Sequence, residues 1–149
     1  MIRKILTDLY ERDLAKLKEE IQFYPNDDDL WKTAEGIPNS GGNLCLHICG
    51  NLKHFFGSVL GNSGYVRDRD AEFANKDVPR DQMLADIDAT RHLVLSTLAE
   101  LTEEDLDEPY PIEVFGHPMT VGYFLTHLST HLNYHLGQIN YHRRILGRS

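Results

Sequence analysis

The residues most able to take part in chemistry are four histidines close to the C-terminal end of the sequence: His127, His131, His135 and His142. An α-helix turns by about 100° per residue, so these spacings place the four imidazoles along one face of a helix, together with Gln138. Neutral imidazole binds Zn, Ni, Cu and Fe(II), and two histidines four residues apart on a helix can chelate one metal ion. The pattern therefore favours a metal site on this helix over a hydrogen-bonded histidine core without metal.

A further ligand has to come from another element, because one helix supplies only two well-placed imidazoles. The segment 43–60 has helical apolar periodicity, and it carries a polar strip of His47, Asn51, His54 and Ser58 beside its apolar face. His47 begins this strip. The strip is the candidate source of the third ligand.

The other histidines are expected mainly in positions that need no direct contact with a metal. His92 lies opposite the apolar face of its predicted helix, so we expect it to be exposed, and His117 beside Pro118 is expected in a loop. His54 and His142 could be ligands, groups that support the ligands, or solvent-facing residues at a bundle end. We favour the last two interpretations for both.

Two cysteines and one charged run also need an interpretation. Cys45 and Cys49 point away from His47 on the same predicted helix, so we expect them to pack in the core. Two cysteines are too few for a disulfide scaffold and are typical of a reducing compartment. We interpret the run Arg67–Asp70 as a salt-bridged loop in preference to an anion site.

The elements that position these residues are predicted to be helices. Apolar periodicity and end signals predict four of them, at residues 3–24, 43–60, 79–101 and 120–146. Pro25 ends the first helix, and Thr120 is the expected N-cap of the last. Residues 102–105 indicate one more short turn, and residues 109–118 cannot be helical and predict a small hairpin or an extended crossover.

This order of elements predicts the fold class, which is all-α. We expect a four-helix bundle with long connections and a short extended segment before the last helix, in one domain spanning residues 1–149. Connections of nearly twenty residues, at 25–42 and 61–78, are long for a compact domain. Such connections usually carry function or cross over the end of a bundle.

Charge and hydropathy exclude several classes of protein. The 149 residues include 15 Lys plus Arg and 23 Asp plus Glu, a net charge of -8, which argues against nucleic acid and anionic membranes as partners. No apolar run approaches the roughly 20 residues that a membrane helix needs. The segment after Met1 turns amphipathic at once, unlike a signal peptide, so we expect a cytoplasmic protein.

The histidine-rich segment also resembles a known signature. Residues 131–138 read HLNYHLGQ, and with His127 before them they resemble the His-x-x-x-His-x-Gly-Gln motif of the DinB/YfiT-like metalloenzyme superfamily. Residues 46–48 match the apolar His-Ile/Leu context from which the second helix of that family supplies a ligand. Residues 49–51 and 67–73 resemble one branch of the superfamily, so the likeness covers nearly the whole chain. Leu136 stands where many members carry Arg, which bears on a substrate contact and leaves the metal ligands unaffected.

The resemblance implies a ligand set and a type of chemistry. It implies that His47, His131 and His135 bind one divalent transition metal, Zn or Ni first, with Fe, Mn and Co as alternatives. Gln138, Asn51 and His127 are candidates for supporting the ligands or orienting a substrate; these six residues complete the expected site. Members with known activity use the metal to activate a low-molecular-weight thiol such as bacillithiol or mycothiol, and many members are dimers, which makes a homodimer one expectation here.

Three functions stay open at this point. The first is a metal-dependent transferase that joins a small-molecule thiol to an electrophilic substrate. The second is a hydrolase that uses metal-bound water, and the third is a non-catalytic bundle whose metal is structural or sensed. The fourth coordination position discriminates between them: an open position favours catalysis, whereas closure by a side chain such as His127 favours a structural metal.

Overall fold

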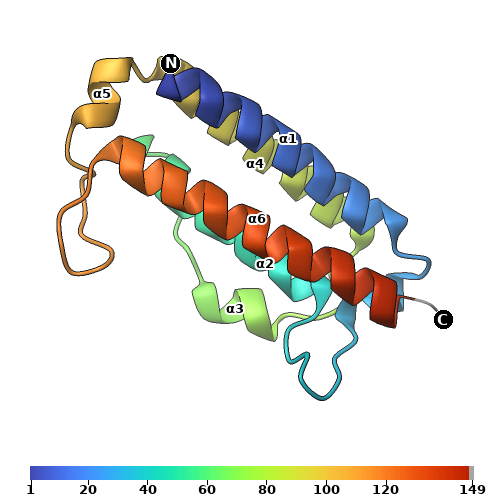
Figure 1. Cartoon of the computed structure of the whole chain (residues 1–149). Helices are drawn as coiled ribbons and strands as arrows, with labels where there is room; N and C mark the ends of the chain where they lie inside the picture. Colours follow the sequence, from blue (N-terminus) through green and yellow to red (C-terminus); the bar gives the residue numbers. More distant parts are fainter. Residues whose placement is uncertain (148–149) are drawn as a thin grey trace.

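The computed structural model describes residues 1–147 and has an all-α fold. Four long helices form a bundle (Figure 1): α1 (Ile2–Phe23), α2 (Gly41–Leu52), α4 (Arg80–Glu100) and α6 (Val121–Leu146). The shorter elements are η1 (Asp27–Trp31, a 3-10 helix), η2 (Lys53–Leu60, a π-helix), α3 (Arg69–Ala74) and α5 (Glu103–Asp107). Within residues 1–147 there is no sheet, so the predicted all-α bundle is confirmed.

The long helices begin and end where the sequence places their signals. Pro25 follows the end of α1, and the Thr120 Oγ1 accepts a hydrogen bond from Tyr123 N at 3.0 Å as the predicted N-cap of α6. The helix bounds differ from the predicted ones by at most two residues. The predicted helix 43–60 is continuous, but its second half winds as the π-helix η2.

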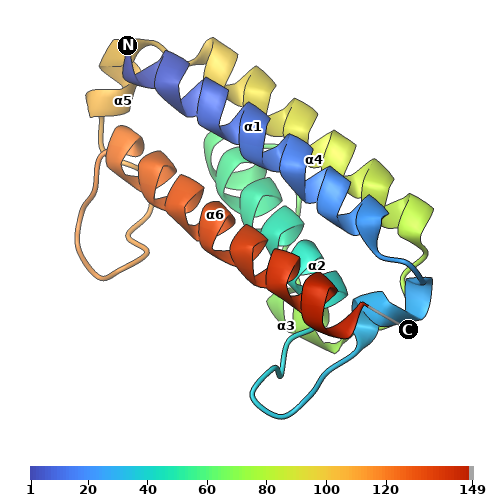
Figure 2. The same cartoon turned by 45° about the vertical axis from the view of Figure 1, so that its right-hand side comes forward.

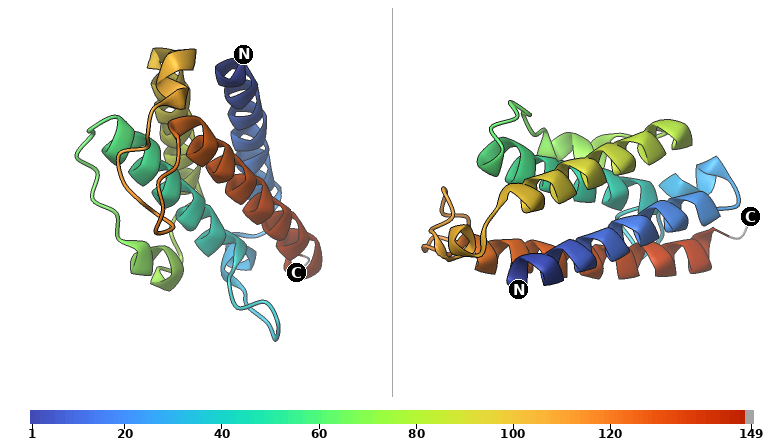
Figure 3. Two further views of the ribbon diagram at one scale, coloured as in Figure 1. Left: turned by 60° about the vertical axis from the view of Figure 1, so that its left-hand side comes forward. Right: turned by 90° about the horizontal axis from the view of Figure 1, so that it is seen from above.

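The bundle consists of two layers, with α1 and α6 in one and α2 and α4 in the other (Figure 3). Helix α1 packs against both α4 and α6, and α2 packs against α6 and α3. One apolar stripe of α1 is almost fully buried: Leu6, Tyr10, Leu14, Leu17 and Ile21. Cys45 and Cys49 are free and buried in the same core, as predicted. The facing pair α2 and α6 carries the histidines of interest.

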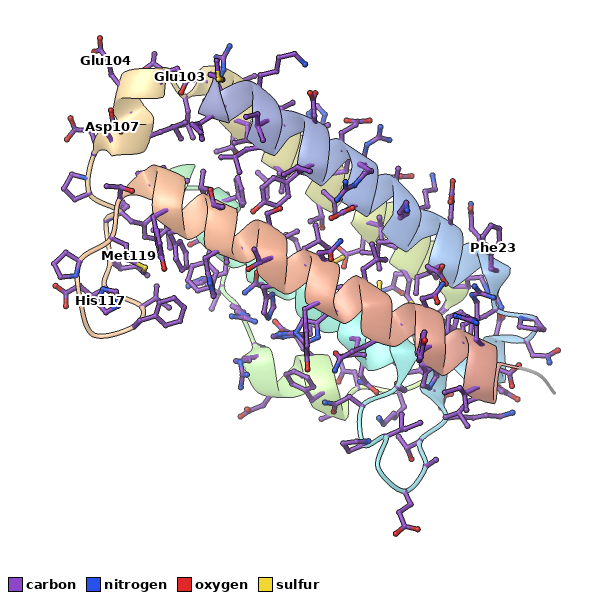
Figure 4. All side chains as sticks on the ribbon, in the orientation of Figure 1. Phe23, Glu103, Glu104, Asp107, His117 and Met119 are labelled. Atoms are coloured by element: carbon purple, nitrogen blue, oxygen red, sulfur yellow. The ribbon has the colours of Figure 1, made fainter. Side chains whose placement is uncertain are left out.

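The connections bring chain segments to both ends of the α2–α6 pair (Figure 2). Residues 61–68 run without regular structure into α3, which packs beside α2. Residues 108–120 form a long loop that is closed at its base by hydrogen bonds from Tyr110 N to Met119 O and from Val121 N to Glu108 O, both 2.8 Å. The predicted hairpin or crossover is therefore a loop with a single antiparallel bridge at its base. His117 lies on this loop, exposed as expected (Figure 4).

Across the described residues, no helix combines the length and the apolar character that a membrane span requires.

His142 is inside the bundle end, so one of the two interpretations favoured for it, a solvent-facing position, is wrong. Its side chain is 2% exposed, its Nε2 donates to the Lys32 carbonyl at 2.8 Å, and its Nδ1 accepts from the Tyr24 hydroxyl at 2.7 Å. A Cβ at Gly41 would overlap that hydroxyl, so glycine leaves the space that Tyr24 fills. These hydrogen bonds join the segment after α1 to α6, and they explain why the imidazole turns inward.

We predict that His142 makes stability depend on pH. Burial lowers its pKa in the folded state, so its contribution is complete above the unfolded pKa of about 6.5 and is lost as the pH falls below that value. The His142→Gln variant should be less stable at pH 7 by about 1–2 kcal/mol, because the Tyr24 hydroxyl and the Lys32 carbonyl lose their hydrogen bonds to the imidazole. It should also lose less stability than the wild type between pH 7 and pH 5. Urea unfolding in the presence of a chelator measures both effects, and parallel pH curves would contradict the assignment.

Candidate metal centre

Three imidazoles converge between α2 and α6. His47 comes from α2, and His131 and His135 lie one turn apart on α6. The His131 Nε2 is 3.2 Å from the His47 Nε2 and 3.0 Å from the His135 Nε2. One nitrogen from each residue lies within 4.8 Å of the others, so the cluster could hold a metal ion. The structure thus brings together the three residues that the resemblance implied as ligands.

The hydrogen bonds around the cluster test whether a metal fits it. The His47 Nδ1 donates to Glu72 Oε1 at 2.9 Å, and the His135 Nδ1 donates to Gln138 Oε1 at 2.7 Å. Both Nε2 atoms therefore lack a hydrogen and direct lone pairs at the His131 Nε2, which has at most one hydrogen to offer. A cation satisfies all three nitrogens at once. In tetrahedral zinc sites, with bonds of about 2.0–2.1 Å, ligand nitrogens lie about 3.3 Å apart, close to the distances from the His131 Nε2 to its two neighbours.

Burial favours the neutral form of His131 and His135 by lowering the pKa of both. His47 is 5% exposed, and His131 and His135 are half-buried. Burial, and then the neighbouring His135 and His47, lower the pKa of His131 to about 4. Burial also lowers the pKa of His135, although the hydrogen bond to Gln138 opposes it. Metal binding requires deprotonated imidazole, so at neutral pH His131 and His135 are in the form that a metal ion needs.

Glu72 is the residue at this centre that sequence reasoning missed. It is 6% exposed and accepts hydrogen bonds from His47 and from Arg67, whose Nε and Nη2 donate to Oε2 and Oε1 at 2.9 Å each. Burial raises the pKa of Glu72, but the hydrogen bonds from His47 and Arg67 outweigh it and the net shift is downward. An ionised Glu72 fixes the tautomer and the ring orientation of His47.

The charged run is only partly a loop. Arg67 and Asp68 lie in the connection, and the salt bridge from Arg67 to Glu72 agrees with the prediction. Arg69 and Asp70, however, form the first turn of α3, because Asp68 caps that helix by accepting a hydrogen bond from Ala71 N at 3.1 Å. The prediction of a loop is therefore wrong for the second half of the run.

Close packing of α3 on α2 brings the Glu72 carboxylate next to the backbone of α2. A Cβ at Gly50 would overlap Glu72 Oε2, so glycine lets the carboxylate approach the helix backbone. Asn43 Nδ2 donates to the carbonyl oxygens of Glu72 at 3.0 Å and of Asn75 at 2.8 Å, which ties α3 to the first turn of α2. In the sequence, the only sign of this close approach is Gly50, a glycine inside an apolar helical segment.

The remaining residues that the sequence suggested for the site lie around the three-histidine cluster or apart from it. Gln138 contacts His135, as its position on the same helix face suggested. His127 lies outside the nitrogen cluster, with its ring 4.8 Å from Phe115 and stacked on Phe124 at 6.1 Å. Asn51 is 7% exposed, and its Oδ1 has no hydrogen-bond partner in the described part of the chain. His54 is half-buried in η2, and the described three-histidine cluster does not include it.

A cavity of about 160 Å³ opens beside the cluster, between α3 and the loop 108–120. His47 and His131 form part of its wall, and Asn51 lines it as well. We call it the aromatic cavity after four rings in its wall: Phe55, Phe115, Phe124 and His127. Among the described residues, His127 thus belongs to the wall of the cavity and is not one of the clustered ligand candidates.

The fold and the cluster define a class of protein: a helical bundle of the DinB/YfiT-like type with a buried three-histidine cluster that could bind a metal. Comparison with known families gives the particular family. The model of the family described as "Protein of unknown function (DUF1572)" matches residues 7–148, nearly the whole chain, and the chain belongs to this DinB/YfiT-like family. No curated protein matches the chain.

We predict that the approach of Glu72 to α2 sets the metal affinity. In Gly50→Ala the added methyl group displaces the carboxylate, and in Glu72→Gln its charge is removed, so each variant should bind Zn²⁺ about 10–100-fold more weakly. Competition with a chromophoric chelator measures the affinity.

Gly137→Ala is the matched control for Gly50→Ala. Gly137 lies in α6 near the ligands, but a Cβ there meets nothing within 4 Å. This variant should keep the wild-type Zn²⁺ affinity and gain up to about 1 kcal/mol of stability from its better helix propensity. Wild-type affinity in both Gly50→Ala and Glu72→Gln would show that Glu72 does not control the site.

Proposed function

We propose that this protein is a metal-dependent enzyme that transfers a small thiol to an electrophilic substrate. The observation that carries the proposal is the pairing of a three-histidine cluster with an adjoining cavity. A structural metal site normally has four protein ligands, whereas a catalytic site has three and keeps one position for water or substrate. Three imidazoles beside a cavity fit the catalytic pattern.

The residues present suit such an ion. His47, His131 and His135 would hold it, and Zn or Ni suits an imidazole donor set, with Fe, Mn and Co as alternatives. When bound, the ion supplies a Lewis acid that lowers the pKa of a coordinated thiol or water. Glu72 and Gln138 hold the rings of His47 and His135 in place, so the ligand geometry is fixed before a substrate arrives.

The reaction needs little further chemistry from the protein. The thiol proton passes to solvent, and the sulfur lone pair forms a bond to the electrophilic carbon. The leaving group departs with the electron pair of the bond that breaks. The aromatic cavity orients the electrophile against the sulfur and limits the access of water, which is the main contribution expected of binding residues in such a transfer.

Hydrolysis is the second candidate function, and the position of His127 favours it. His127 lies one helical turn before His131 and lines the cavity, where an imidazole can act as a general base toward water. The electrophile, the thiol and the expected homodimer stay predictions.

We predict that a thiol binds at the centre. With Co²⁺ as the bound ion, a small thiol should give a sulfur-to-metal charge-transfer band, because thiolate is a soft ligand. His47→Ala should abolish the band, since the two remaining histidines cannot fix the geometry. His92→Ala removes an exposed histidine on α4 and should leave the band unchanged. If no thiol perturbs the Co²⁺ spectrum while simple esters are hydrolysed faster toward alkaline pH, the hydrolase function replaces the transferase function.

A further inference from the structure

We propose that the aromatic cavity recognises its substrate by a carboxylate, which Arg69 in the wall of the cavity binds. This inference rests on the proposed function, because it concerns the substrate of the same centre. It assigns a chemical class to that substrate: a small, ring-sized acid whose reactive end faces His47 and His131.

Charge at the cavity is the first support. The chain carries a net charge of -8, yet the lining of this cavity includes Arg67 and Arg69 and, among the described residues, no Asp or Glu. Arg67 is already committed to Glu72. Arg69 is exposed, and within the described chain no carboxylate pairs with it, so its guanidinium remains available to an anion. A guanidinium fits a carboxylate with two parallel hydrogen bonds.

The position of Arg69 relative to the metal centre is the second support. The Phe73 ring packs 4.8 Å from the His47 ring, and the Arg69 guanidinium carbon lies 5.4 Å from the same Phe73 ring. The His47 ring and the guanidinium therefore both contact the ring of Phe73. A ligand with its reactive atom at one end and a carboxylate at the other end of a ring-sized body can reach both.

The size and walls of the cavity are the third support. An apolar cavity of about 150 Å³ holds one benzene ring, and the volume here is about 160 Å³. Phe55 packs edge-on against Phe124 at 5.0 Å, and Phe115 packs against Phe124 at 6.1 Å, so aromatic rings form one part of a wall that is otherwise polar. The buried Asn51 Oδ1, which has no partner within the described residues, offers an acceptor to a ligand N–H or O–H.

Two thiols that differ only in charge test the proposal. The probes are 4-mercaptobenzoate and 4-mercaptobenzamide, whose substituent is too far from the sulfur to reach the same metal ion. The dissociation constant of each is measured from the charge-transfer band of the Co²⁺ protein. We expect 4-mercaptobenzoate to bind at least about 10-fold more tightly than 4-mercaptobenzamide, because a charge-assisted hydrogen bond contributes that much affinity. Arg69→Gln should bring the two constants together without loss of metal.

Arg12→Gln is the matched control. It removes the same charge, but Arg12 pairs with Asp13 and lines a different cavity, between α1 and α6. The preference for the benzoate should survive in this variant. Equal binding of the two thiols by the wild type, or a preference that persists in Arg69→Gln, overturns the proposal.

A second titration separates this proposal from the proposed function. If neither thiol gives a band, thiol transfer fails, and the cavity is then tested with benzoate and benzamide on the Zn²⁺ protein by NMR. Saturable shifts at Phe115 with benzoate alone, lost in Arg69→Gln and kept in Arg12→Gln, support carboxylate recognition. Absence of those shifts overturns it.

Discussion

The hydrogen bond between His47 and Glu72 links the candidate metal centre to the rest of the fold. A single imidazole on α2 could adopt several orientations, but the carboxylate on α3 fixes one of them and holds the hydrogen on Nδ1. The Nε2 of His47 then points at the two histidines of α6. Arg67 compensates the buried charge of Glu72, and Gly50 provides the space for it. The short helix α3 thus matters for the site although it carries none of the three ligands.

Burial of so many polar groups is costly unless each finds a partner. His135 has Gln138, His142 has Tyr24 and the Lys32 carbonyl, and Glu72 has two donors. The three Nε2 atoms differ from these groups, because they face one another with too few hydrogens between them. The remaining core is apolar and continuous, so the bundle does not depend on a metal for its hydrophobic packing. The cluster is therefore best explained as a site for a cation.

Periodicity and helix-end signals were sufficient to predict the four long helices, because apolar spacing and residues such as Pro25 and Thr120 act locally. The convergence of His131 and His135 was also local, since both lie on one helix face. Three features depend on contacts between distant elements and could not be predicted this way. Glu72 needs the packing of α3 on α2, and the buried position of His142 needs a hydroxyl and a carbonyl from the segment after α1. The aromatic cavity needs the loop 108–120 to fold back beside α6.

Elemental analysis of protein purified without a metal-affinity tag tests whether the three histidines hold one metal ion. We expect about one divalent transition metal ion per chain in the wild type. We expect none in the His131→Ala/His135→Ala double variant, whose circular dichroism should still show the helical bundle. Equal metal content in the two folded proteins, or a wild type that takes up no metal when Zn²⁺ or Ni²⁺ is supplied, would contradict a metal site at these histidines.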